Sequence, residues 1–280
     1  MRAVTGPAPL RLRPLEIGDL LDETFRVYRR HFFLFAGLSI ILSIPQAALS
    51  GYGYYSFLGT FTQQLATGGP VNLGQLQTSI IALAVGVVVF LVISPFYYGS
   101  VTYAACQSAI GRAVTPGEVV SAVMRKYFPL LGYVLLFYLM SVLFCVFPLW
   151  VWILTGWIAV MPVMFVEDIG LVGAMGRSWR LVQGRWWRTF LIILLTLIVS
   201  YFASLALGAF LSLGQYLIEI VAAPLVALSI ATAAAEVVRS LVNPLFQIVI
   251  VLVYFDLRVR REGLDLFQLA QRVPAPPLAT

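Results

Sequence analysis

The sequence predicts an all-α, polytopic membrane protein with six transmembrane helices, arranged as three helical hairpins that each follow a cytoplasmic amphipathic interfacial helix. Of its 280 residues, 61% are hydrophobic and 11% are charged, whereas a soluble domain has about 25% charged residues. The apolar residues form runs of roughly 17 to 25, long enough to cross ~30 Å of hydrocarbon as helices. In addition, an amphipathic segment that leads into an apolar run occurs three times.

The clearest copy of this pattern spans residues 166–195. In an α-helix, Leu171 and Met175 fall on one side and Arg177 and Arg180 on another. The pair Trp186-Trp187 then leads into an apolar run. We therefore expect an interfacial helix that turns into a span.

The first repeat-like unit covers residues 15–110 and follows a flexible lead-in over 1–14. An amphipathic helix to residue 30 leads into a span over 32–49, with a kink at Pro45. Residues 50–77 contain no charged residue, which is typical of an exported loop with interfacial aromatic residues. A second span over 79–105, or as far as 110, closes the unit.

The second unit covers residues 115–166. Thr115-Pro116-Gly117-Glu118 predicts a helix start, and the short helix reaches Lys126. A span over 128–147, a tight outer turn at Pro148 and a span over 149–166 follow. Such a short connection makes the two spans antiparallel neighbours.

The third unit covers residues 168–263, with spans from 189 to 213 and from 241 to 257. The segment 215–238 between them is apolar enough to cross, but Pro224 and an Ala/Ser/Thr-rich run weaken that reading. We expect an outer interfacial or re-entrant helix there. The single membrane domain ends at 272, before a flexible tail over 273–280.

Charge sets the expected orientation. With both termini in the cytoplasm, all of the 18 basic residues except Arg239 lie inside, in agreement with the positive-inside rule. If 215–238 crossed the membrane, the basic cluster at 258–261 would lie outside, against this rule. The net charge of +6 therefore indicates topology and not nucleic acid, because the basic residues lie at the ends of apolar runs.

Three segments resemble a known family: LRPLEIGDLLDETFRVYRRHF near the N-terminus, AMGRSWRLVQGRWWRTF from Ala174, and YFDLRVRREGLDL from Tyr254. They are similar to the membrane domain associated with bacterial glycerophosphoryl diester phosphodiesterases. The resemblance implies a six-helix protein of the bacterial cytoplasmic membrane with no established activity, since catalysis in fused members belongs to a separate soluble domain.

The sequence offers little reactive chemistry, so we expect no enzyme activity, cofactor or metal. His31 is the single histidine and is interpreted as an interfacial residue. Glu167 and Asp168 are interpreted as a helix cap and as charge partners for Arg177 or Arg180. The two cysteines, Cys106 and Cys145, are taken as small apolar residues.

The candidate function is the binding of anionic lipid headgroups or of a membrane or cytoplasmic protein partner by basic and aromatic residues at the cytoplasmic face. These residues are Arg26, Arg29, Arg30, Arg177, Arg180, Arg185, Trp186, Trp187, Arg258, Arg260 and Arg261. The alternative is a transporter or flippase for a lipophilic or amphiphilic substrate. A continuous polar cavity that reaches Gln46, Asn243 or Gln247 would favour it.

Overall fold

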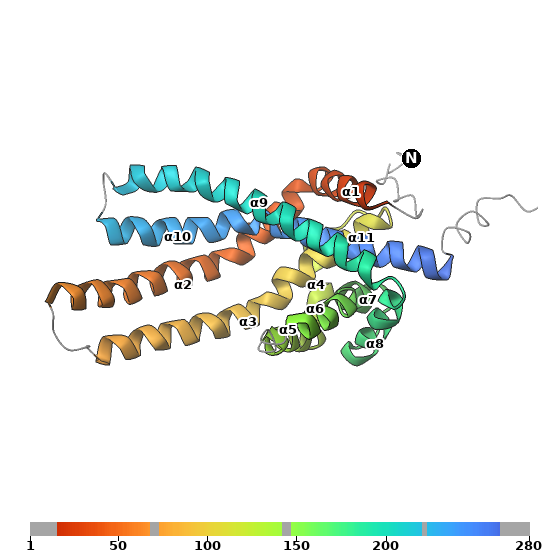
Figure 1. The fold of residues 1–280 in the computed structure, drawn as a ribbon, viewed down its shortest axis with the longest axis horizontal. Coiled ribbons are helices and arrows are strands. Elements are labelled where there is room, and N and C mark those ends of the chain that lie inside the picture. Colours follow the sequence, from red (N-terminus) through yellow and green to blue (C-terminus); the bar gives the residue numbers. More distant parts are fainter. Residues whose placement is uncertain (1–15, 68–72, 142–146, 220–222, 264–280) are drawn as a thin grey trace, which may run out of the picture.

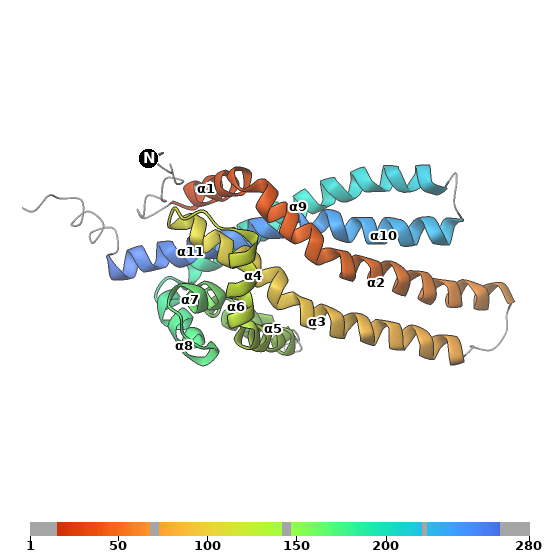
Figure 2. The same cartoon turned by 180° about the vertical axis from the view of Figure 1, so that it is seen from behind.

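The computed structural model describes residues 16–67, 73–141, 147–219 and 223–263, which form helices and no strands. The predicted lead-in, the predicted tail and Cys145 lie outside these residues. Figures 1 and 2 show the helices in front and rear views. Their bounds are α1 Ile17–Arg30, α2 Phe32–Thr67, α3 Leu73–Ala109, α4 Pro116–Arg125, α5 Tyr127–Ser141, α6 Phe147–Gly156, α7 Val160–Val166, α8 Leu171–Val182, α9 Trp186–Glu219, α10 Pro224–Ser240 and α11 Asn243–Glu262.

The threefold pattern of short helix and long apolar helix is present in the structure. The short helices α1, α4 and α8 are followed by α2, α5 and α9 after breaks of one to three residues. The breaks fall at His31, at Lys126 and at 183–185, where the sequence changes from basic to aromatic. Thr115 caps α4 in a capping box with Glu118, as its sequence predicts.

Several helices of the described chain are long and apolar enough to cross a membrane. They number five, or six if α4 and α5, which are bent by 72°, count as one broken span. The prediction of an all-α polytopic protein is therefore confirmed. The stretches are Phe32–Thr62, Leu76–Ala109, Phe147–Val166, Trp186–Gly214 and Pro224–Glu262, with Pro116–Arg125 plus Tyr127–Ser141 as the bent pair.

The prediction of an exported loop over 50–77 was wrong for its described residues. Helix α2 continues to residue 67 and has 36 residues, about 54 Å at 1.5 Å per residue. Gly51 allows close helix contact instead of a turn. A Cβ atom on Gly51 would lie 3.0 Å from the carbonyl oxygen of Ser229 and 3.1 Å from the Cβ of Ala233, both in α10.

The segment 215–238 was predicted to form a separate interfacial or re-entrant helix. In the structure its described helical residues are divided between α9 and α10. Helix α9 extends to residue 219, and α10 returns beside it and packs against α2. Only Leu241 and Val242 separate α10 from α11, and Pro224–Glu262 forms one apolar stretch. The small residues that weakened the prediction allow α10 to approach α2 closely.

Helix α11 forms the centre of the molecule. It contacts α1, α3, α7, α8 and α9 and lies between them in both views (Figures 1 and 2). Its residues 247–257 are all buried, which explains why the run 248–253 is apolar on every side. The buried residues of α1, which include Leu20, pack against this centre.

The described part of the second hairpin consists of three short helices. Helix α5 has 15 residues, α6 has 10 and α7 has 7, and α6 with α7 forms the apolar stretch Phe147–Val166. The predicted span over 149–166 is broken at 157–159, between α6 and α7. The short helices cover part of the long helices α3 and α9, and the cavity described below lies at this place.

Candidate functional site

Two of the arginines assigned to lipid binding are instead part of an ion-pair cluster inside the protein. The Arg177 Nε lies 2.9 Å from a carboxylate oxygen of Glu167, and its Nη2 contacts Glu262. The Arg258 Nε lies 2.9 Å from the other oxygen of Glu262. The Tyr254 hydroxyl donates to Glu167 at 3.0 Å. The cluster joins α7, α8 and α11.

A second ion-pair cluster is centred on Asp256, whose side chain has no exposed surface. The Arg260 Nε lies 2.9 Å from one oxygen of Asp256, an i,i+4 pair within α11. The Arg188 Nη1, from α9, lies 2.5 Å from the other oxygen. The last turns of α11 are therefore tied to α9 by charge.

The remaining residues of the predicted lipid surface are distributed over two sides of α11. Helix α1, which carries the exposed Arg26, Arg29 and Arg30, lies on the opposite side of α11 from α8 (Figures 1 and 2). Arg180 and Arg261 are exposed and Arg185 is half-buried. Among the described residues, the predicted arginines thus lie on two sides of α11.

The two tryptophans at the start of α9 have different roles. Trp187 is 72% exposed, as expected for an interfacial anchor. Trp186 stacks on Phe190 with ring centroids 5.2 Å apart, and its indole N–H donates to the carbonyl of Trp152 at 3.2 Å. Only Trp187 is available to lipid in the way that the sequence predicts.

Of the roles predicted for the two acidic residues after α7, the pairing of Glu167 with Arg177 is confirmed. The predicted helix cap was wrong, because α8 begins after Gly170 without a side-chain cap, and Asp168 pairs with Lys126 instead of Arg177 or Arg180. Asp168 lies 2.6 Å from the Nζ of Lys126. The hydrogen bond and the charge of Lys126 lower the pKa of Asp168. This pair connects the start of the third unit to the break between α4 and α5.

Backbone groups at the break between α6 and α7 form hydrogen bonds with side chains from neighbouring helices. The Ser178 hydroxyl donates to the carbonyl of Gly156 at 2.8 Å and accepts from the N–H of Ala159 at 3.2 Å. The Tyr133 hydroxyl donates to the carbonyl of Trp157 at 3.1 Å. These bonds hold the backbone of a broken helix at the wall of a cavity.

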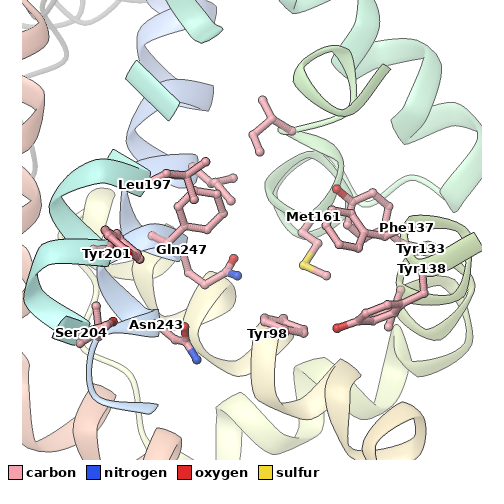
Figure 3. Close-up of a pocket in the computed structure, with 16 residues that line it drawn as sticks. Tyr98, Tyr133, Phe137, Tyr138, Met161, Leu197, Tyr201, Ser204, Asn243 and Gln247 are labelled. Carbon is pink, nitrogen blue, oxygen red and sulfur yellow. The ribbon is translucent and has the colours of Figure 1, made fainter. Parts of the chain in front are cut away.

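The main cavity has a volume of about 560 Å³ and lies between α3, α5, α7, α9 and α11. Figure 3 shows Gln247 and Asn243 pointing into it from one wall and Met161 from the wall opposite. Other walls are aromatic and aliphatic, with Phe137 and Leu197 as examples. Its size is typical of a small-molecule site, and its mixture of apolar walls with a few polar groups suits an amphiphile.

Two hydrogen bonds orient the amide side chains of α11 at this cavity. The Thr102 hydroxyl lies 3.1 Å from the Oε1 of Gln247 and 2.9 Å from the carbonyl oxygen of Tyr98, so its single hydrogen faces two acceptors. The Asn243 Nδ2 donates to the Tyr97 hydroxyl at 2.6 Å. Both bonds connect α11 to α3.

A second cavity of about 260 Å³ adjoins the main one, and both are lined by Tyr98, Tyr138 and Asn243. The second cavity is also lined by Gln46 and Glu236. The two together are called the double cavity below. Of the three polar residues named for the transporter alternative, Gln46 lines the second cavity, Gln247 lines the main cavity and Asn243 lines both.

Sequence reasoning missed Glu236 and most of the aromatic lining. Glu236 was placed in an outer segment because residues 215–238 were separated from the last span. Two signals in the sequence could have identified Glu236. It lies three residues before Arg239 and seven residues before Asn243. The pairing of α3 tyrosines with α5 tyrosines depends on the fold and leaves no local pattern.

Two further candidate centres have limited chemistry. Within the described parts of the chain, no group of three or more His, Cys, Asp and Glu side chains could hold a metal ion. His31 lies at the break between α1 and α2, where burial and then the charge of Arg30 lower its pKa. Cys106 is fully enclosed in α3.

Comparison with known proteins gives no relative. No protein-family model, no curated protein and no solved structure matches the chain. The resemblance of the three sequence segments to the phosphodiesterase-associated membrane domain therefore remains a prediction.

Proposed function

We propose that this protein is a transporter or flippase that binds a lipophilic or amphiphilic substrate in the double cavity. The observation that carries the proposal is the reach of this cavity to Gln46, Asn243 and Gln247. Its walls come from α3, α9 and α11, which belong to the candidate membrane spans. A substrate could therefore be recognised inside the bilayer.

The composition of the main cavity supports an amphiphile over a fully polar solute. Aromatic rings and aliphatic side chains, among them Phe137, Leu197 and Phe246, form most of its wall. Ser200, Ser204 and Gln247 add hydrogen-bonding groups. Apolar walls with a small number of oriented polar groups are typical of small-molecule sites.

The broken helix α6–α7 supports the same proposal. Irregular backbone at membrane depth is tolerated where it is buried in protein or lines a cavity, and discontinuous helices form the substrate sites of many transporters. Ile158 in the break and Met161 in α7 line the main cavity. The break thus contributes directly to the proposed site.

Anionic lipid binding at the protein surface is a second candidate function, favoured by the exposed arginines of α1. Arg29 and Arg30 are exposed, and Phe33 beside them is 91% exposed. Basic residues near a membrane surface attract anionic headgroups with roughly 1 kcal/mol each. An acidic protein partner would use the same charges.

The transport proposal is tested in liposomes that contain the purified protein and a fluorescent single-chain amphiphile in one leaflet. We expect the wild type to speed the movement of the amphiphile to the other leaflet above the protein-free rate. Ser200→Trp, which fills the main cavity, should return the rate to that of protein-free liposomes. Equal rates for the wild type and Ser200→Trp would contradict the proposal.

A matched control is available on the same helix. Ser212 lies in α9 and is exposed, and it does not line the main cavity. Ser212→Trp adds the same side chain at a distance from the site and should transport at the wild-type rate. Loss of transport in both variants would indicate damage to α9 and not a filled cavity.

A further inference from the structure

Several hydrogen-bond acceptors line the second cavity, beside tyrosine hydroxyls and the Asn243 amide. Ser43 and Ser94 line it, and both donate their hydroxyl hydrogens to backbone carbonyls of their own helices at 2.9 Å. Their oxygen lone pairs therefore remain as acceptors. The Oε1 of Gln46 is buried and has no hydrogen-bond partner among the described residues. An unpaired buried acceptor is costly unless a ligand or water satisfies it.

The charge at this cavity is negative. Among the described residues that line the double cavity, Glu236 is the only charged one. One of its oxygens lies 3.3 Å from the Nη1 of Arg239, which is outside the cavity lining and 62% exposed. Such an exposed pair is weak. A cationic ligand group would compete with Arg239 for Glu236.

We propose that the second cavity binds the protonated amine head of the substrate, while its apolar part occupies the main cavity. An ammonium group supplies up to three N–H donors, which matches the acceptors of Gln46, Ser43 and Glu236. The connection through Tyr98, Tyr138 and Asn243 places the head beside the apolar part. This inference rests on the proposed function and assigns the chemical class of the substrate as a lipophilic amine.

The inference is tested by equilibrium binding in phosphatidylcholine nanodiscs with three probes that share one pyrene-labelled twelve-carbon chain and end in an amine, an alcohol or a carboxylate. We expect the amine to bind roughly tenfold more tightly than the alcohol, because a charge-assisted hydrogen bond replaces a neutral one. The carboxylate should bind most weakly, because Glu236 repels it.

Two variants test the role of Glu236. Glu236→Gln should lower the affinity for the amine to that for the alcohol and leave the alcohol affinity unchanged, which also shows that the variant is folded. Arg239→Gln removes the competing cation, so it should strengthen amine binding. If Glu236→Gln does not fold, the amine affinity of Arg239→Gln tests the inference alone, and an affinity no higher than that of the wild type would overturn it. A preference for the amine that persists in Glu236→Gln would overturn the inference.

Failure of this inference and failure of the proposed function give different results. If all three probes bind the wild type equally and all are lost in Ser200→Trp, the double cavity binds amphiphiles but does not select an amine. If no probe binds the wild type, the proposed function itself fails.

Discussion

The hydroxyl oxygen of Thr102 in α3 lies 3.1 Å from the amide oxygen of Gln247 in α11. The two residues are 145 positions apart in the chain, and Gln247 is 7% exposed. The contact joins the first and third units at the proposed site.

Replacing Thr102 with Val should weaken the binding of an amphiphile about fivefold, because the net value of one hydrogen bond is about 1 kcal/mol. Fluorescence titration of the pyrene-labelled alcohol in nanodiscs measures this change. Thr196→Val is a suitable control, since Thr196 is buried in α9 and does not line the main cavity. Equal affinity in the wild type and Thr102→Val would contradict the role of the bond.

Replacing Asp256 with Asn should lower the free energy of unfolding by about 3 kcal/mol, because it removes the negative charge that Arg188 and Arg260 share in a buried place. Denaturant titration of the protein in detergent micelles measures the loss. The control Asp22→Asn, at an exposed position of α1, should change stability by less than about 0.5 kcal/mol. A similar small change for Asp256→Asn would show that the cluster contributes little.

Replacing Ser178 with Ala should lower the free energy of unfolding by about 2 kcal/mol. The change leaves the carbonyl of Gly156 and the N–H of Ala159 without the hydroxyl that now bonds both. Ser141→Ala provides a control, because Ser141 is a serine bonded to its own helix at an exposed place. Ser178→Ala as stable as Ser141→Ala would mean that the helix break needs no side-chain support.

Replacing Arg29, Arg30, Arg180 and Arg185 together with Gln should reduce the retention of phosphatidylglycerol by the purified protein, at roughly 1 kcal/mol per residue. Lipid extraction and quantification after purification at low salt measure the loss. Arg177 is excluded from this set because it pairs with Glu167, so its loss would affect folding. If the variant retains as much phosphatidylglycerol as the wild type, these arginines do not bind the lipid and serve only to set the topology.

The sequence was sufficient for the features that depend on neighbouring residues. The three breaks at His31, Lys126 and 183–185 follow from a local change from basic to aromatic residues. The start of α4 follows from Thr115 and Pro116, whose capping chemistry acts within one helical turn. Apolar runs and helical periodicity are local signals of the same kind.

Features that depend on distant partners could not be predicted in this way. Gly51 and its neighbours resemble loop residues until Ser229 and Ala233 of α10 are placed against them. Arg188 and Asp256 are 68 positions apart, and no spacing rule connects them. The lining of the double cavity combines residues from separate units. Glu236 belongs to it only because α10 continues into α11.

Native mass spectrometry of the protein, gently extracted from its own membrane, tests the central claim most directly. We predict one small amphiphile bound per protein, absent from Ser200→Trp and present both in Ser212→Trp and in the variant that lacks the four exposed arginines. A wild-type protein that carries no small amphiphile, or one whose only ligand is an anionic phospholipid lost with those arginines, would contradict the account.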